Sequence, residues 1–342
     1  MAPRVTYESG ITISIDDSSQ IGEARRAATT IASDAGLSEV EAGQFAIIVA
    51  EAATNIAKHA TRGEIALRSA GRDARSVEVV AMDKGPGIRD LDQAFRDGYS
   101  TAGSSGTGLG AMSRLATAVD VFTVPEVGTV VAARVDGSRT GGRPRHAGFD
   151  IGVVRAAKRG ESDCGDDWSL VLDDGRGRGV LTLADGLGHG LPAAEASRRA
   201  AEVAEEHAAE SPGHVVAELH RALRSTRGAA VAVAEFAADE PTLRFAGLGN
   251  ISAAIVAPGE SKSLVSHNGI AGHEMRKIQE FSYVWPLGAV LVMHSDGVSA
   301  RWDLNRYPGL LLRCASVVAG VIYRDFSRGR DDALVVVVRR VT

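Results

Sequence analysis

The sequence predicts two consecutive domains of mixed α+β class, the second of them an α/β sandwich. The chain has 342 residues, and at roughly 150 residues per domain this length favours two domains. Residues 137–147 are rich in glycine and basic side chains and lack apolar periodicity, which is typical of a flexible linker. Helix-like and strand-like periodicities occur on both sides of this segment. We therefore expect domains at residues 1–136 and 148–342.

Charge and cysteine usage favour a soluble cytoplasmic protein. The formal net charge of −5 comes from interspersed acids and bases, which argues against nucleic acid and membranes as partners. The two cysteines, Cys164 and Cys314, are far apart, which fits reduced thiols better than a disulfide framework. The first ten residues lack the apolar stretch of a signal peptide, and no apolar run approaches the ~20 residues that span a bilayer.

Periodicity predicts the secondary structure of each half. In the first half we expect helices at 21–35, 39–59 and 109–118, and strands at 6–15, 65–68, 77–82 and, as a pair, within 119–135. In the second half we expect helices at 192–210, 212–225 and 310–321. The strands expected there are 150–156, 168–173, 179–183, 229–237, 243–248, 253–257, 290–294 and 333–341. Two helices between two groups of strands favour a sandwich.

Three motifs of the first half supply parts of a nucleotide site. Glu51 and Asn55 lie at i and i+4 of a predicted helix, so their side chains project from one face. A carboxylate there can accept a proton, and an amide can hold a magnesium ion. Asp83 ends a predicted strand and opens the turn Asp-Lys-Gly-Pro-Gly, where its carboxylate can accept a hydrogen bond from an adenine amine. Residues 98–110 are glycine-rich and lead into a helix, which suits phosphate binding.

These motifs, in this order, resemble the N, G1 and G2 boxes of the GHKL ATPase family, whose domain is a Bergerat-type α/β sandwich. The likeness to RsbT-type serine kinases spans nearly all of residues 1–136. No helical hairpin with a phospho-accepting histidine precedes the motifs, which argues against a histidine kinase. The resemblance implies ATP and Mg²⁺ as cofactors, Glu51 as the general base on the acceptor hydroxyl, and Asn55 as the magnesium ligand. The nucleotide-binding residues that it implies are Asn55, Asp83, Gly85, Gly87, Gly106, Gly108, Gly110 and Thr129.

Four acids of the second half stand where predicted strands meet turns: Asp166, Asp185, Asp296 and Asp331. A single Asp-Gly pair is usually a turn. Carboxylates gathered at strand ends beside glycine, however, suit hard divalent cations. Two such ions roughly 3.5–4 Å apart suit the hydrolysis of a phosphomonoester.

The second half resembles the SpoIIE-like branch of the metal-dependent (PPM) protein phosphatases, which fold as an α-β-β-α sandwich, and looks like the RsbX type. The segments at 185–190, 295–298 and 331–332 carry this likeness. It implies two Mn²⁺ or Mg²⁺ ions and four catalytic acids. The implied metal-binding groups are Asp166, Asp185, the carbonyl of Gly186, Asp296 and Asp331.

One position departs from that pattern, because the family often carries an acid three residues after the first aspartate, where this chain has Ser169. Asp167 or Asp163 could take that role. His189 could donate a proton or simply pack in its turn. Residues 250–283 could contact substrate.

The two resemblances imply opposing activities on one chain. RsbT-like kinases phosphorylate serine or threonine of STAS-domain proteins, and RsbX-like phosphatases remove that phosphate. We expect a partner-switching regulator that acts on an RsbS/RsbR-like or anti-anti-sigma-like STAS protein and controls a stress-response sigma factor. One alternative is a nucleotide-dependent binding module that sequesters a sigma factor or activates another phosphatase. The other is a chain in which one catalytic half is degenerate and serves as a scaffold.

Overall fold

The computed structural model describes residues 10–60, 62–69, 75–95, 108–137, 148–173 and 177–341. These residues form two compact units, one before and one after the predicted linker. Residues 138–147 of that linker lie outside the described residues. Within the described ranges, no helix has both the length and the apolar character needed to cross a bilayer.

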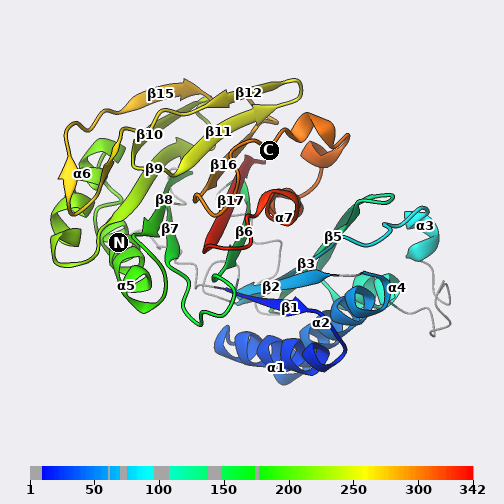
Figure 1. Cartoon of the computed structure of the whole chain (residues 1–342). Helices are drawn as coiled ribbons and strands as arrows, with labels where there is room; N and C mark the ends of the chain where they lie inside the picture. Colours follow the sequence, from blue (N-terminus) through cyan, green and yellow to red (C-terminus); the bar gives the residue numbers. More distant parts are fainter. Residues whose placement is uncertain are drawn as a thin grey trace. The chain divides into compact units, whose positions relative to one another are not determined.

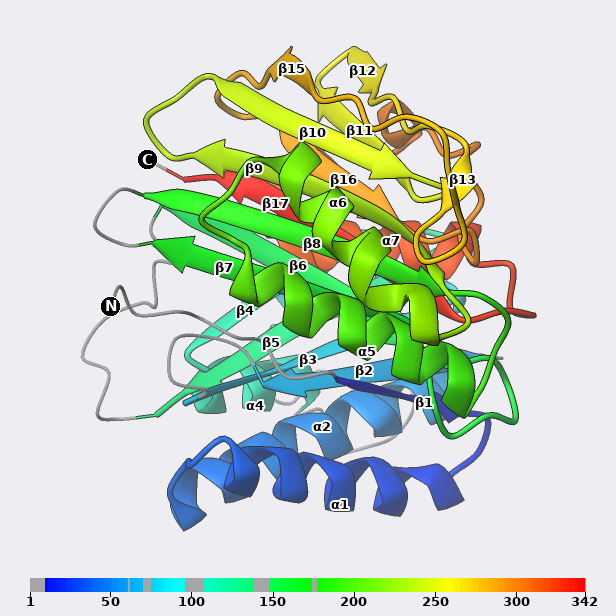
Figure 2. The same cartoon turned by 90° about the vertical axis from the view of Figure 1, so that its left-hand side faces the viewer.

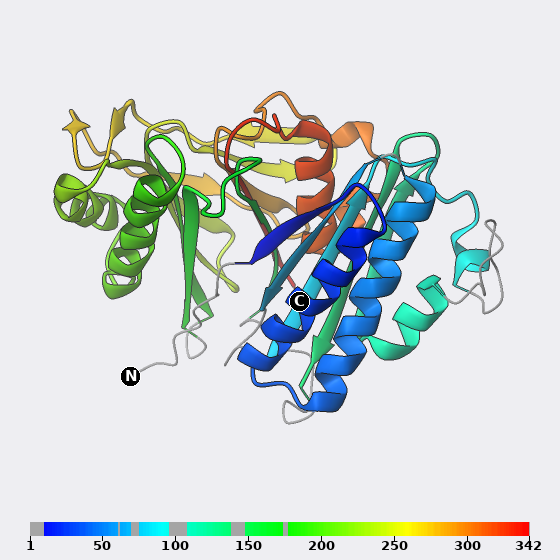
Figure 3. The same cartoon turned by 60° about the horizontal axis from the view of Figure 1, so that its bottom comes forward.

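The first unit is a five-stranded antiparallel sheet with helices on one face (Figures 1 and 3). The strand order is β1-β2-β3-β5-β4. Its elements are β1 (Ile11–Ile15), α1 (Ser19–Asp34), α2 (Glu39–His59), β2 (Gly63–Ser69), β3 (Ser76–Asp83), α3 (Leu91–Ala94), α4 (Gly108–Leu115), β4 (Ala118–Val124) and β5 (Gly128–Asp136).

Helix α2 is the central element of this unit, and its bounds agree with the prediction. A capping box starts it: Ser38 Oγ accepts the N–H of Glu41 at 3.3 Å, and Glu41 Oε2 accepts the N–H of Ser38 at 2.8 Å. Its apolar face, which includes the buried Phe45 and Ile48, packs into the core between helices and sheet. The capping box and the buried apolar face together fix the position and rotation of α2. They therefore also fix the direction of the side chains near its C-terminal end.

The third predicted helix of the first half is shorter than expected. It ends at Leu115, whereas the periodicity suggested 118. The chain joins the sheet instead, because the N–H of Thr117 donates to Arg134 O at 2.7 Å and Thr117 Oγ1 accepts the N–H of Asp136 at 3.0 Å. Backbone pairing with β5 therefore outweighs the helical propensity of the alanines there.

The second unit consists of two five-stranded antiparallel sheets, with helices on their outer faces (Figure 2). The sheet orders are β15-β10-β9-β8-β7 and β12-β11-β16-β17-β6. The strands are β6 (Phe149–Ala156), β7 (Asp166–Asp173), β8 (Arg178–Gly186), β9 (Ala229–Ala237), β10 (Thr242–Leu248), β11 (Ser252–Ala257), β12 (Glu260–Ser263), β13 (Gly269–Ile270), β14 (Glu274–Met275), β15 (Phe281–Val284), β16 (Val290–His294) and β17 (Ala333–Arg340). The helices are α5 (Leu191–Glu206), α6 (Pro212–Ala222) and α7 (Ala315–Phe326), with 3₁₀ turns η2 (Leu223–Ser225), η3 (Leu304–Arg306) and η4 (Leu310–Leu312).

Helices α5 and α6 cover the sheet that contains β7, β8 and β9, and α7 covers β6 and β17. The core between the two sheets is apolar throughout and includes an aromatic cluster. Phe236 meets Phe149 and Trp285 edge to face, with ring centroids 4.8 and 5.4 Å apart. This packing aligns the ends of the strands from both sheets.

The predicted fold class is confirmed for both units: helices on one sheet in the first, and an α-β-β-α sandwich in the second. The main strands lie within three residues of their expected bounds, except that β1 starts at Ile11 and the predicted start at residues 6–9 lies outside the described residues. The short elements α3, β12, β13, β14 and β15 were not expected, because two to four residues are too few to show a period. Helix α7 starts at Ala315 and ends at Phe326, so both of its ends lie five residues after the predicted ones.

Candidate nucleotide and metal sites

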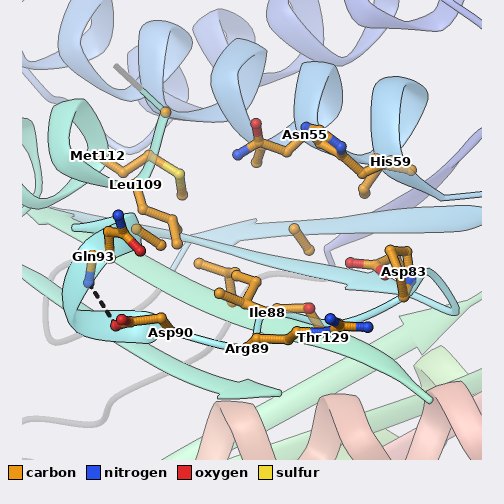
Figure 4. Close-up of a pocket in the computed structure, with 18 of the residues that line it drawn as sticks. Asn55, His59, Asp83, Ile88, Arg89, Asp90, Gln93, Leu109, Met112 and Thr129 are labelled. Atoms are coloured by element: carbon orange, nitrogen blue, oxygen red, sulfur yellow. Dashed lines mark hydrogen bonds between the residues drawn. The ribbon is translucent and has the colours of Figure 1, made fainter. Parts of the chain in front are cut away.

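A cavity of about 620 Å³ lies in the first unit between α2, α4 and the loop after β3 (Figure 4). Five of the residues expected to bind nucleotide line it: Asn55, Asp83, Gly87, Gly108 and Thr129. Apolar side chains such as Ile88, Leu109 and Met112 form much of the rest. A flat apolar ring with a polar edge would fit such a lining.

Asp83 and Thr129 are directly opposite each other in the β3–β5 pair, which explains how residues so distant in sequence reach one cavity. Asp83 Oδ1 accepts the N–H of Gly85 at 2.7 Å, so the carboxylate is held in the turn that it opens. Gly85 itself is not among the described residues that line the cavity. Its role is to fit close to this carboxylate, since a Cβ there would lie 2.9 Å from both Asp83 Oδ1 and His59 O.

The loop after β3 is joined to the β4–β5 hairpin. The N–H of Glu126 donates to Pro86 O at 2.9 Å, and the N–H of Ile88 donates to Thr123 Oγ1 at 2.8 Å. Gly87 has a φ of 71°, and a Cβ there would lie 2.5 Å from Val124 O, so glycine is required. Thr123 Oγ1 also lies 3.1 Å from Oγ1 of Thr129, which lines the cavity. The Thr123 hydroxyl therefore contacts both the loop after β3 and the cavity lining.

Asn55 and Gly108 meet at the other side of the cavity. A Cβ on Gly108 would lie 3.1 Å from Asn55 Nδ2, so the start of α4 comes close to this amide. Glu51, one turn earlier on α2, is not among the described residues that line the cavity. Gly110 is buried within α4 and likewise does not line it, whereas Gly106 lies outside the described residues.

Several lining residues were missed by the sequence reasoning. One of them is His59, the exposed last residue of α2, which lines the cavity beside Asp83 (Figure 4). Arg89, Asp90 and Gln93 follow the glycine turn and supply further polar groups to the lining. The i+4 spacing from Asn55 to His59 was the available signal, because it places both side chains on one face of α2.

A second cavity, of about 470 Å³, lies in the second unit and contains three of the four predicted acids: Asp185, Asp296 and Asp331. The carboxylate of Asp185 accepts the backbone N–H of Asp296, so these two residues are in contact. Asn250, the first residue of the segment expected to contact substrate, also lines the cavity, and its Nδ2 donates to Asp296 Oδ2 at 2.7 Å. Asn268, Gly269 and Ile270 belong to the predicted substrate-contacting segment and line the same cavity.

The fourth acid, Asp166, lies behind the cavity and is 1% exposed. It pairs directly with Asp185 in the β7–β8 register. Its Oδ2 accepts the hydroxyl of Ser295 at 2.6 Å, and Ser295 Oγ accepts the N–H of Leu334 at 3.0 Å. Ser295 is fully buried and precedes Asp296 in the turn after β16. Its hydroxyl therefore connects this turn to Asp166 on β7 and to the start of β17.

Burial and mutual repulsion raise the pKa values of the paired acids. Desolvation, followed by the charges of Asp296 and Asp331, raises the pKa of Asp185 to about 7. Desolvation, followed by the charge of Asp185, raises the pKa of Asp166 well above its usual range, although the Ser295 hydroxyl opposes this shift. Carboxylates held this close need a proton or a cation between them.

Asp332 is an additional acid at this site. It is 4% exposed, its Oδ1 accepts the N–H of Lys158 at 2.8 Å, and its Oδ2 is buried with no hydrogen-bond partner among the described residues. Its charge also raises the pKa of Asp166 and Asp185. An unpaired buried oxygen beside four converging carboxylates fits a hard divalent cation. The predicted acids therefore have the chemistry of a metal centre.

The remaining predicted residues take positions around this centre. A Cβ on Gly186 would lie 2.1 Å from Ala193 O, so glycine is required where α5 approaches β8. His189 lines the cavity, and its Nδ1 lies 2.9 Å from Glu161 Oε1. Ser169 and Asp167 lie on the face of β7 that α5 covers, because the alternating Trp168 lies in the core between the sheets. Neither residue faces the acids.

The first unit matches a known domain family. Residues 15–135 match the model of the histidine kinase-like ATPase domain. Over 111 residues the chain is 32% identical to the serine/threonine-protein kinase RsbT of Bacillus subtilis (strain 168), an alignment that covers 32% of this chain and 84% of RsbT.

The second unit matches another family. Residues 175–341 match the model of stage II sporulation protein E (SpoIIE). The chain thus belongs to the histidine kinase-like ATPase family in its first domain, and its second domain is similar to the SpoIIE family. Over 148 residues it is 25% identical to the phosphoserine phosphatase RsbX of Bacillus subtilis (strain 168), covering 43% of this chain and 73% of RsbX. Both predicted resemblances are confirmed.

Solved structures agree with this assignment. A chain from a structure of the bacterial stressosome, described as a modular system adapted to control secondary messenger signalling, has a TM-score of 0.52 and 26% identity. It covers 56% of this chain and 99% of that chain. RsbX in complex with magnesium has a TM-score of 0.51 and 20% identity, covers 56% of this chain and 95% of RsbX, and shows the shared fold.

Proposed function

We propose that the ATPase domain transfers the γ-phosphoryl group of ATP to a serine or threonine of a STAS-domain protein, and that the phosphatase domain removes it. The observation that carries this proposal is that one chain contains a relative of the kinase RsbT and a relative of the phosphatase RsbX. Opposing activities on one chain suit a regulator that sets the phosphorylation level of a single partner. Such a regulator would control stress-response sigma-factor signalling indirectly.

In the ATPase domain, the site residues bind and position the nucleotide. Asp83, oriented by the N–H of Gly85, would accept a hydrogen bond from the adenine amine, with Thr129 beside it. Asn55 would hold the Mg²⁺ ion that accompanies ATP, and Glu51 would accept the proton of the acceptor hydroxyl. Phosphoryl transfer depends mainly on positioning and charge neutralisation, so geometry supplies most of the catalysis.

In the phosphatase domain, Asp166, Asp185, Asp296, Asp331 and the carbonyl of Gly186 would hold two Mn²⁺ or Mg²⁺ ions. Such a metal pair supplies Lewis-acid activation of water and stabilises the leaving oxygen. The chain's own groups do the rest. Ser295 orients Asp166, Asn250 orients Asp296, and the side chain of Lys158 lines the cavity as a positive charge for a phosphate.

The linker would raise the local concentration of each domain near a shared phosphoprotein. A flexible segment of about a dozen residues keeps both domains within reach of one bound partner. Either activity could then follow the other without release of the substrate into bulk solution.

The proposal is tested with the full chain, radiolabelled ATP and purified RsbS- or RsbR-like STAS proteins. We expect label transfer in Mg²⁺ with the Asp296→Asn variant, which lacks the phosphatase site, and label removal in Mn²⁺ with the Asp83→Asn variant. If no STAS partner receives label, the proposed kinase activity is wrong. If no label is released, the proposed phosphatase activity is wrong.

A second candidate is a nucleotide-gated binding module in the first domain. The position of Glu51, which is not among the described residues lining the cavity, favours it. The Glu51→Ala variant separates the two candidates. Loss of transfer with ATP affinity retained supports the kinase, whereas partner binding that needs ATP but is unaffected by this substitution supports the binding module.

A further inference from the structure

A second cluster of metal-ligating side chains lies at the junction of α5 and α6. It consists of His207, Glu210 and Glu218, with His214 paired to both glutamates, and none of these residues lines the acidic cavity at the start of α5. The two places are separated by the whole of α5, whose 16 residues span roughly 24 Å.

The ligand atoms of this cluster converge closely. His207 Nδ1 lies 3.1 Å from Glu210 Oε1, and His214 Nε2 lies 2.6 Å from Glu210 Oε2 and 3.0 Å from Glu218 Oε1. His207, Glu210 and Glu218 each offer one ligand atom, and these three atoms lie within 4.8 Å of one another. Ligands around a tetrahedral zinc ion stand about 3.3–3.5 Å apart, so the side chains would have to bring these atoms closer together by up to about 1.5 Å to hold one ion.

Hydrogen bonds do not satisfy the cluster as it stands. His214 Nε2 faces two carboxylate oxygens, but one ring nitrogen carries at most one proton and can donate to one of them. Glu210 Oε2 is buried and has no hydrogen-bond partner of good geometry within the described part of the chain. Arg221 pairs with Glu218. A cation placed between the imidazoles and the carboxylates would satisfy all of these groups together.

The backbone that carries the cluster is held in place. The guanidinium of Arg178 donates to Ala208 O at 2.7 Å and to Glu210 O at 3.2 Å, from the neighbouring strand β8. Ser211 caps α6 by accepting the N–H of His214 at 3.4 Å, and Glu280 Oε2 accepts the N–H of Gly213 at 3.1 Å. The loop between the helices is therefore ordered before any ligand arrives, which lowers the entropic cost of binding.

We propose that His207, Glu210, His214 and Glu218 bind a divalent transition-metal ion, with zinc as the best match. Two imidazole nitrogens and two carboxylate oxygens form a four-ligand set of the kind that zinc prefers, and softer or larger ions suit it less. The ion would clamp the end of α5 to the first turns of α6. It would thereby stiffen the helical layer that covers β7 and β8, the strands that carry Asp166 and Asp185.

The test compares the metal content of the untagged full chain with that of single variants. The proteins are stripped with a chelator, dialysed against zinc in excess Mg²⁺, and analysed for bound metal. We expect the unaltered chain to hold one more zinc ion than His207→Ala and His214→Ala. The matched control is Glu206→Gln, an exposed neighbour on α5 outside the cluster, which should retain that ion.

Two further readouts locate the ion. Co²⁺ in place of zinc should give the visible absorption bands of a tetrahedral site in the unaltered chain and the control, and these bands should vanish in both histidine variants. Zinc should also raise the melting temperature of the unaltered chain and not of these variants. If a histidine variant fails to fold by circular dichroism, the near-isosteric Glu210→Gln replaces it. Equal zinc content and equal Co²⁺ spectra in all proteins would overturn the proposal.

Discussion

Asp166 and Asp185 lie directly opposite each other in the antiparallel pair β7–β8, and Asp166 is completely enclosed behind Asp185. Like charges at paired positions are normally unfavourable, more so when buried. Burial and repulsion raise the pKa values of both carboxyl groups. The Ser295 hydroxyl donates to Asp166 and the backbone N–H of Asp296 donates to Asp185, and both hydrogen bonds oppose this shift. This arrangement costs stability without a cation and is the physical basis of the phosphatase site that we propose.

The stability of the metal-free protein should depend on the protonation of Asp185. Its pKa of about 7 in the folded state exceeds the value of 3.8 for an unperturbed carboxyl. The folded state thus binds the extra proton, so this group's destabilising effect is absent below pH 4 and complete above pH 7. In the presence of a chelator at pH 8, the free energy of unfolding of the Asp185→Asn variant should therefore exceed that of the unaltered chain by a few kcal/mol. At pH 5 the difference should be much smaller. A difference independent of pH would contradict this account.

Ser295 should be essential to the geometry of the acids. Ser295→Ala leaves the buried carboxylate of Asp166 and the N–H of Leu334 without their shared partner, which should cost about 1–3 kcal/mol of unfolding free energy. Manganese affinity, measured by calorimetry, should fall as well, because Asp166 loses its orientation. Ser299→Ala, at a partly exposed hydroxyl nearby, is the control and should change neither quantity.

Asp83 should determine nucleotide affinity in the first domain. Asp83→Asn replaces one of the two accepting carboxylate oxygens by an NH₂ donor, which must then face either the N–H of Gly85 or the adenine amine. ATP affinity, measured by calorimetry, should fall at least about tenfold, which corresponds to about 1.4 kcal/mol. Asp92→Asn, on the exposed side of α3, should bind ATP normally. Unchanged affinity in Asp83→Asn would show that the adenine lies elsewhere.

Ser169 should not be a missing metal ligand. Its side chain is 2% exposed and lies on the face of β7 that α5 covers, opposite Thr182 in the β7–β8 register. Ser169→Asp would therefore bury an unpaired carboxylate and destabilise the protein by several kcal/mol. Manganese stoichiometry should stay the same in the folded fraction. A gain of one bound ion would place this residue in the centre after all.

Much of the fold follows from local signals in the sequence. The capping box at Ser38 and Glu41 and the uninterrupted apolar face of α2 fix the longest helix. The buried runs of β9 and β16 match their expected bounds because both strands are flanked by glycine or turn residues. The Asp-Gly steps at Asp185 and Asp296 mark strand ends, and the acids converge because the strands are paired.

Other features could not be read from the sequence. Lys158 lines the acidic cavity and its backbone N–H donates to Asp332, a contact between segments far apart along the chain that no periodic pattern shows. The sequence placed Asn250 in a segment that could contact substrate, but it did not show the hydrogen bond of this residue to Asp296. The end of α4 was misplaced because cross-strand hydrogen bonds to β5 decide it. The sequence did not show on which face of β7 the side chain of Ser169 lies, because this depends on which alternate residues of β7 enter the core between the sheets.

The most direct test of the central claim is to map the phosphorylated residue of one STAS-domain partner by mass spectrometry. The full-length Asp296→Asn variant is given ATP and Mg²⁺ with the partner, and the modified residue is identified. The full-length Asp83→Asn variant with Mn²⁺ is then added to the purified phosphoprotein. We predict that the second protein removes the phosphate from the very residue that the first one modified. Phosphate that stays on that residue, or a partner that is never modified, would contradict the account of two opposing activities acting on a shared substrate.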